Sequence, residues 1–139
     1  MESSFRLIQM VRMAMMVSII LYVFVAETLV HRTAAAPDAN FYFVLTLVAI
    51  TLVGMIVAVR RLFVLRSEAV LAAHPEDAAA LARWRSGHLI TYALSEAIGL
   101  FGFGLRLLSF ALSQVAAFYV VAVVLMMYFG PRRLSNELG

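Results

Sequence analysis

GHLITYALSEAIGLFGFGLRLL, residues 87–108, is long and apolar enough to cross a bilayer, which takes about 20 residues. On a helix with about 100° per residue, Glu96 lies about 80° from the centre of a stripe of small and polar residues. That stripe is roughly 80° wide and contains His88, Tyr92, Ser95, Gly99, Gly102 and Arg106. The pattern predicts a membrane-spanning helix whose polar chemistry gathers on one side.

The composition of the whole chain also indicates a membrane protein. Of its 139 residues, 64% are hydrophobic and only 14% are charged, which is too apolar for a water-soluble domain of this size. The absence of cysteine excludes disulfides, thiolate catalysis and cysteine-based metal sites. Every Lys/Arg position is arginine, so the chain cannot form a lysine Schiff base.

Four apolar segments are predicted to span the membrane, at about residues 10–30, 41–60, 87–108 and 110–130. A polar cytoplasmic loop, residues 61–86, separates the second and third spans. Within it, Arg60–Arg66 is expected to prolong the second helix, and Pro75 is expected at the first position of a new helix. We therefore predict an all-α fold with one domain, residues 1–139: an integral membrane four-helix transmembrane bundle of two α-hairpins.

The arginines predict the orientation of these spans. Nine lie in the two terminal flanks and the long loop, and only Arg32 and Arg106 lie at the opposite ends of the spans. By the positive-inside rule, both termini face the cytoplasm, as expected for a protein of the cell inner (cytoplasmic) membrane. The net charge of +3 could suggest a nucleic-acid partner. Arginines at the ends of apolar segments are topology signals instead, so no such partner is expected.

Glu96 is the first candidate for a functional group. It lies near the middle of its span, where a carboxyl group costs several kcal/mol unless it is paired or protonated. A carboxyl there can take up and release a proton, so Glu96 is an ion- or proton-binding candidate, with Ser95 and Tyr92 as hydrogen-bond donors. The alternative is that Glu96 is a neutral or salt-bridged packing group within the bundle.

The segment Ala93–Gly102, ALSEAIGLFG, resembles the carboxylate-bearing helix of the proteolipid c subunit of rotary ATP synthases. The resemblance covers about residues 74–108, and only Glu96 matches a functional position of that family. In the family, this acid binds and releases H⁺ or Na⁺ as a ring of hairpins turns. The chain departs from the family by having two more spans, only Gly54 in the second span, and Arg106 within the third.

Glu27 and Arg106 are a candidate interhelical ion pair, because each lies at the same end of its predicted span. The alternative is that each side chain extends separately to the membrane interface. Ala26–Glu27 also resembles the first helix of small four-span multidrug exporters, which carries an essential glutamate.

Other residue patterns favour packing over chemistry. Gly99, Gly102 and Gly104 predict close helix packing, because a glycine cluster inside a membrane span cannot act as a phosphate loop. The histidines are far apart and match no metal-binding spacing, so no metal and no cofactor is expected. His74 and His88 are expected at solvated loop or interface positions. The methionines near the N-terminus, which could bind Cu(I), are better explained as gap fillers: Met10, Met13, Met15 and Met16.

Two functional hypotheses follow. The first is a non-catalytic structural or accessory subunit, working in the lipid bilayer as a homo-oligomer or as part of a larger membrane complex. The second is a proton- or ion-translocating subunit in which Glu96 is the working group. An enzyme is not expected, because the sequence offers no catalytic triad, phosphate loop or paired catalytic carboxylates.

Overall fold

The computed structural model describes residues 2–29, 39–108 and 110–131, and its described elements are all helices. They are α1 (Glu2–Leu29), α2 (Ala39–Val59), the π-helix η2 (Arg60–Leu65), α3 (Arg66–Ala73), α4 (Ala78–Leu107) and α5 (Leu112–Tyr128). The elements α2, η2 and α3 form one continuous helical segment. Three segments are long and apolar enough to cross a membrane: Glu2–Leu29, Ala39–Ala73 and Ala78–Leu107. The prediction of an all-helical fold is confirmed for the described residues, and three of the segments have the length and composition that spanning requires.

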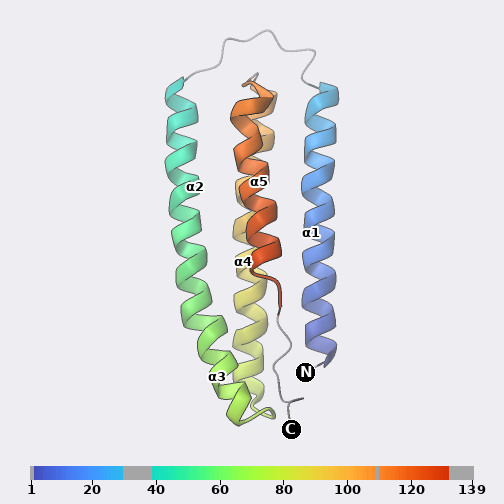
Figure 1. Ribbon diagram of the computed structural model, residues 1–139, viewed down its shortest axis with the longest axis vertical. Helices are drawn as coiled ribbons and strands as arrows, with labels where there is room; N and C mark the ends of the chain where they lie inside the picture. The colour runs from blue at the N-terminus through green and yellow to red at the C-terminus, as the bar shows by residue number, and fades with distance from the viewer. Residues whose placement is uncertain (1, 30–38, 109, 132–139) are drawn as a thin grey trace.

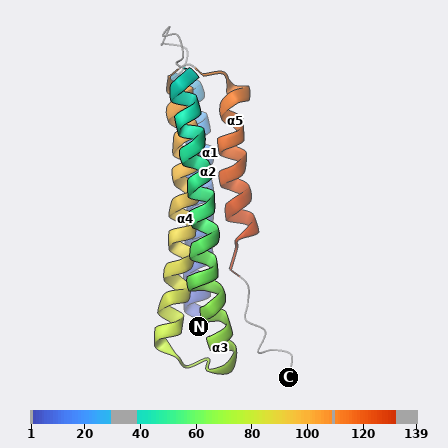
Figure 2. The same ribbon diagram turned by 90° about the vertical axis from the view of Figure 1, so that its left-hand side faces the viewer.

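Helix α4 is the centre of the arrangement. It contacts α1, α2, η2, α3 and α5. Figure 1 shows α1 and α2 on opposite sides of the α4–α5 pair, and Figure 2 shows α5 on one face of the layer formed by the other helices. Helix α4 buries eleven residues, whereas α2 buries only two, so α4 supplies the surface on which the other helices assemble.

The pairing of the helices differs from the two predicted hairpins. Helices α4 and α5 pack closely as an α-hairpin. Helices α1 and α2 each pack against α4 instead of against one another. The small and polar residues on α4 give both helices a surface for close approach, which explains this arrangement. The predicted turn between the first two spans lies mostly in residues 30–38, outside the described residues.

Most of the predicted loop, residues 61–86, is helical. The helix continues through η2 and α3 to Ala73, and α4 begins at Ala78 after a short turn. Pro75 lies in that turn, so its expected position at the start of the helix is wrong. Asp77 caps α4 instead: its carboxylate accepts a hydrogen bond from the N–H of Ala80 at 3.0 Å. This contact satisfies one of the free amides at the helix start.

Gly87 sets how closely η2 approaches α4. A Cβ atom at this position would lie 2.6 Å from Cγ2 of Val64 and 3.0 Å from Cβ of Phe63. Only glycine therefore fits here without a shift of η2, since real Cβ contacts under 3.0 Å essentially do not occur. The contact holds the lower half of the long second segment against the central helix.

Helix α5 is shorter than the predicted span at residues 110–130. It has 17 residues, which corresponds to about 26 Å at 1.5 Å per residue. Its end is followed by Phe129, Gly130 and Pro131, and a glycine and a proline directly after the last turn are typical of a helix end. Figure 2 shows that α5 ends well above the turn between α3 and α4.

Large apolar side chains are exposed along the outer faces of α1, α2 and α5, among them Phe24, Phe43 and Val120. Continuous apolar surface on this scale is unfavourable in water and normal against lipid. The bundle therefore has the surface of a membrane protein, with its buried groups concentrated around α4.

Candidate functional site

Polar groups occupy three levels along α4, named here by their height in Figure 1. The upper level is defined by Glu27 and Arg106, the middle level by Tyr22 and Glu96, and the lower level by Arg12, Arg60 and His88. Because α1 and α4 run in the same direction, residue numbers rise with height in both helices. Each level therefore contains one residue of α1 and one residue of α4.

At the upper level, the structure brings the two predicted partners together. The Nε atom of Arg106 donates to Oε1 of Glu27 at 2.7 Å, and Nη2 donates to Oε2 at 3.1 Å. The remaining Nη1 donates to the carbonyl of Phe110 at 2.9 Å. A bidentate pair of this kind is among the strongest and most directional polar contacts in proteins. It ties α1 to α4 and to the turn that leads into α5.

At the middle level, Glu96 is half-buried between α4 and α1. Its Oε1 atom accepts a hydrogen bond from the hydroxyl of Tyr22 at 2.7 Å, and the Tyr22 ring packs against Phe103 with centroids 5.6 Å apart. Among the described residues, Glu96 forms no salt bridge. The contact is therefore between a carboxyl group and a neutral donor.

The donors expected for Glu96 have other partners. Ser95 donates to the carbonyl of Thr91 in its own helix at 2.8 Å, and Tyr92 donates to the carbonyl of Phe129 at 3.4 Å. The offset of Glu96 from the polar stripe explains the difference, because it turns the carboxyl toward α1. Sequence reasoning missed Tyr22, which lies five residues before Glu27 on α1.

At the lower level, basic side chains gather around the end of α5. Arg60 donates to the carbonyl of Phe129 at 3.3 Å, and its guanidinium carbon lies 4.4 Å from the centroid of the Phe129 ring. The Arg12 guanidinium lies directly against Gly130, where any side chain would overlap it. Both arginines are within electrostatic reach of His88. From the sequence, Arg12 and Arg60 were interpreted only as orientation signals.

His88 is fully buried between the helices, so its expected solvation is wrong. Its ring stands edge-on to Trp84 at 4.7 Å and is tilted against Tyr92 at 6.0 Å. Neither ring nitrogen has a hydrogen-bond partner of good geometry within the described part of the chain, although the Phe129 backbone lies close enough to act on the ring. His74, in contrast, is exposed in the turn before α4, as expected.

Two of the three predicted packing glycines make close contacts. A Cβ atom at Gly99 would lie 3.3 Å from Ile19 of α1, and one at Gly102 would lie 3.0 Å from Cβ of Phe118 of α5. Gly104 has nothing within 4 Å of such an atom, so it makes no close contact with the described helices of this chain, and its packing role stays a prediction. It lies on the side of α4 that faces away from both neighbours.

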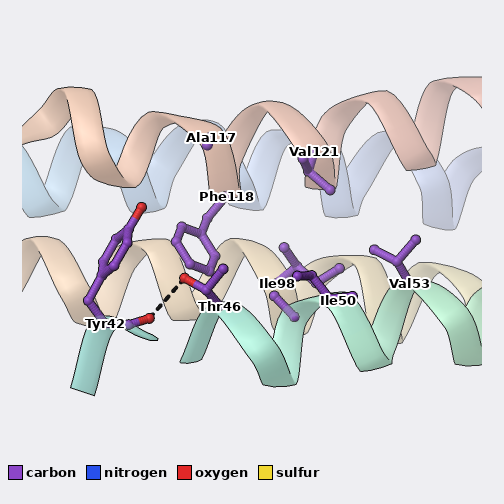
Figure 3. A pocket seen from close by; sticks show the side chains of 9 residues that line it. Tyr42, Thr46, Ile50, Val53, Ile98, Ala117, Phe118 and Val121 are labelled. Atoms are coloured by element: carbon purple, nitrogen blue, oxygen red, sulfur yellow. Dashed lines mark hydrogen bonds between the residues drawn. The ribbon is translucent and has the colours of Figure 1, made fainter. Parts of the chain in front are cut away.

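A groove lies between α2 and α5, with a cavity volume of about 190 Å³. Figure 3 shows Ile50, Ile98 and Val121 among the side chains that line it. The hydroxyl of Thr46 is engaged by the carbonyl of Tyr42 at 2.8 Å, so the lining offers little polar chemistry. The groove suits an apolar occupant such as an acyl chain or a helix side chain.

In the described residues, no three His, Cys, Asp or Glu side chains come close enough to hold a metal ion. Comparison of the chain with protein-family models, curated proteins and solved structures finds no match. Function is therefore inferred from the geometry of the three levels.

Proposed function

We propose that the protein is a non-catalytic, multi-pass membrane protein that serves as a structural or accessory subunit of an oligomeric membrane assembly. The observation that carries this proposal is that both membrane-level carboxylates hold helices together. Glu27 joins α1 to α4 through Arg106, and Glu96 joins the same helices through Tyr22. Such interhelical contacts stabilise bundles in lipid, where the hydrophobic effect does not drive helices together.

The surface of α2 supports assembly with a partner. This helix buries only Ala49 and Ile56, and its outward side includes Gly54, which has open space around it. Small residues on an exposed helix face permit the close approach of another helix in lipid. A partner helix on this side would also cover the groove beside α5.

Disulfide cross-linking tests this proposal directly, because the natural chain has no cysteine to interfere. Ala58→Cys places a thiol on the exposed side of α2, one turn from Gly54, and Ile20→Cys is the matched control on the exposed side of α1. We expect oxidation in native membranes to give cross-linked species with Ala58→Cys and far fewer with Ile20→Cys. A monomer at both positions, together with a monomeric mass in mild detergent, would contradict the proposal.

A second candidate function is proton or ion carriage by Glu96. Its supporting observation is the pairing of Glu96 with the neutral hydroxyl of Tyr22 and with no described cation. A carboxyl group at mid-membrane depth whose described partner is a neutral hydroxyl is a functional candidate by default, because such groups often mark ion and proton pathways.

Glu96→Gln separates the two functions, since glutamine keeps the shape and the hydrogen bond but cannot titrate. The measurement is proton flux into liposomes, followed with a pH-sensitive dye, alongside the oligomeric state in detergent. Intact assembly with lost flux favours carriage. Unchanged flux, or lost assembly, favours the structural role.

A further inference from the structure

The lower level contains buried side-chain atoms without hydrogen-bond partners, whereas the residues that define the upper and middle levels have none among the described residues. Four buried side-chain nitrogen or oxygen atoms of the described residues have no partner, and three of them belong to this level: Arg12 Nε, His88 Nδ1 and His88 Nε2. Native proteins leave few buried polar groups unpaired, and each exception calls for an explanation. Their concentration at one height marks a polar region of the bundle that the described residues satisfy only in part.

The charges at this level point to the sign of the missing group. Arg12, on α1, forms no salt bridge with any described residue. The carboxylate of Glu27 is fifteen residues further along the same helix, which places it about 22 Å away. Glu68, the carboxylate on α3, accepts the indole N–H of Trp84 at 3.4 Å.

The end of α5 offsets only part of this positive charge. A helix C-terminus carries roughly half a negative charge, and its effect is confined to the last turn. The Phe129 carbonyl already accepts from both Arg60 and Tyr92. The guanidinium of Arg12 therefore faces an environment that calls for an anion.

The height of the level identifies the source of that anion. His88 precedes Glu96 by eight residues, or about 12 Å along the helix at 1.5 Å per residue. With Glu96 near mid-membrane, this height is close to the edge of a hydrocarbon core about 30 Å thick, where lipid phosphates begin. Basic pockets between membrane helices at this depth suit anionic headgroups.

We propose that Arg12 and Arg60 form a binding site for the phosphate of an anionic membrane lipid, at the point where α5 ends between α1 and η2. The terminal Nη groups of the half-buried Arg12 donate to the phosphate oxygens, beside the charge of Arg60. His88 and Arg12 Nε are enclosed within the bundle and stay outside this contact. This site is independent of the subunit role and of Glu96.

Trp84 provides the measurement, because it is the only tryptophan and is buried beside His88. Thermal unfolding of the delipidated protein is followed by Trp84 fluorescence, with phosphatidylglycerol, phosphatidylcholine or inorganic phosphate added to neutral detergent. We expect phosphatidylglycerol to raise the midpoint and the other two to have little effect. Equal effects of the two lipids would overturn the proposal, and an equal effect of inorganic phosphate would replace the lipid with a free anion.

Arg12→Gln and Arg6→Gln are the matched variants. Arg6 is on the same helix, and its exposed side chain pairs with Glu2. We expect Arg12→Gln to weaken the apparent affinity for phosphatidylglycerol by about tenfold or more, because a charge-assisted hydrogen bond is lost. Arg6→Gln should leave the affinity unchanged, and equal losses in both variants would show a diffuse surface effect and overturn the site.

A measurement on the unmodified protein keeps the test decisive if Arg12→Gln does not fold. Lipids that remain bound after mild purification are identified by native mass spectrometry and compared with the lipid composition of the source membrane. Enrichment of anionic lipid on the protein supports the site. A bound fraction that matches the membrane composition contradicts it.

Discussion

The upper and lower levels of the bundle use arginine in opposite ways. At the upper level, Arg106 has three donors engaged by Glu27 and Phe110, so its charge is matched within the chain. At the lower level, Arg12 lies against Gly130 with its buried Nε atom unpaired, and no described carboxylate matches its charge. Both arginines are half-buried. Arg106 belongs to α4, and Arg12 belongs to α1, which packs against α4.

The upper level is a contact whose charges are matched within the chain, and the lower level contains a charge that no described residue matches. A matched ion pair in a low-dielectric site stabilises the fold and leaves nothing for a ligand to bind. An unmatched guanidinium contributes little to the fold and retains its capacity for an anion. The two levels therefore differ in what they leave over: the upper level fixes the helices, and the lower level retains a guanidinium for the anion proposed above.

The largest expected effect comes from breaking the upper pair. Glu27→Gln leaves the Arg106 guanidinium without its counter-charge in a partly buried site. Removing one partner of a fully buried pair costs about 3–5 kcal/mol, and the partial exposure of this pair lowers our expectation to about 2–3 kcal/mol. The measurement is the free energy of unfolding in mixed micelles, by titration with a denaturing detergent.

The exposed pair of Glu2 and Arg6 on α1 provides the control for this prediction. Its side chains are 68% and 74% exposed, so Glu2→Gln should cost at most about 1 kcal/mol. Equal losses in Glu27→Gln and Glu2→Gln would show that the upper level does not fix the helices. The contrast between the two ends would then disappear.

A smaller effect is expected from steric fit near the upper level. Gly102→Ala places a methyl group 3.0 Å from Cβ of Phe118 and 3.3 Å from the ring of Tyr119. We expect a loss of about 1–2 kcal/mol, since overpacking forces neighbouring groups to shift. Gly104→Ala, two residues away with open space around it, should be neutral or stabilising by up to about 1 kcal/mol. Similar losses in both variants would exclude close packing of α4 on α5 as the cause.

The height of each polar group could be predicted from the sequence, because the rise per residue of a helix is fixed. That reasoning named Glu27 and Arg106 as partners, and it placed Glu96 between them and the arginines of the loop. It also predicted that residues 60–66 would continue the second helix, which the structure describes as η2 and the start of α3.

Lateral neighbours could not be predicted in the same way. Apolar helices with weak sidedness fit several partners almost equally well, so the sequence did not reveal that α1 and α2 would pack on opposite sides of α4. The donor to Glu96 was missed for this reason, since Tyr22 approaches from a helix whose facing side was unknown. Arg12 was treated as an orientation signal, because only the end of α5 shows that its guanidinium lies inside the bundle.

The middle level is expected to show an intermediate response. Tyr22→Phe removes the hydroxyl that donates to Glu96 and keeps the ring contact with Phe103. Interhelical hydrogen bonds in membranes contribute about 0.6 kcal/mol on average, and we expect a loss of about 0.5–1 kcal/mol here. A double-mutant cycle with Glu96→Gln measures the coupling between the two side chains. A coupling of zero would mean that this hydrogen bond does not hold α1 to α4.

The smallest effect is expected at the lower level in the absence of lipid. Arg12→Gln removes a charge that no described carboxylate matches, and with it the attraction to the end of α5, which is about 0.3–1 kcal/mol for a cation near a helix C-terminus. The variant also avoids burying an unpaired guanidinium, which offsets this loss. We therefore expect the free energy of unfolding in neutral detergent to change by less than about 0.5 kcal/mol, far less than for Glu27→Gln. A loss as large as that of the upper pair would mean that Arg12 is already matched within the protein, and the difference between the two ends would have no physical basis.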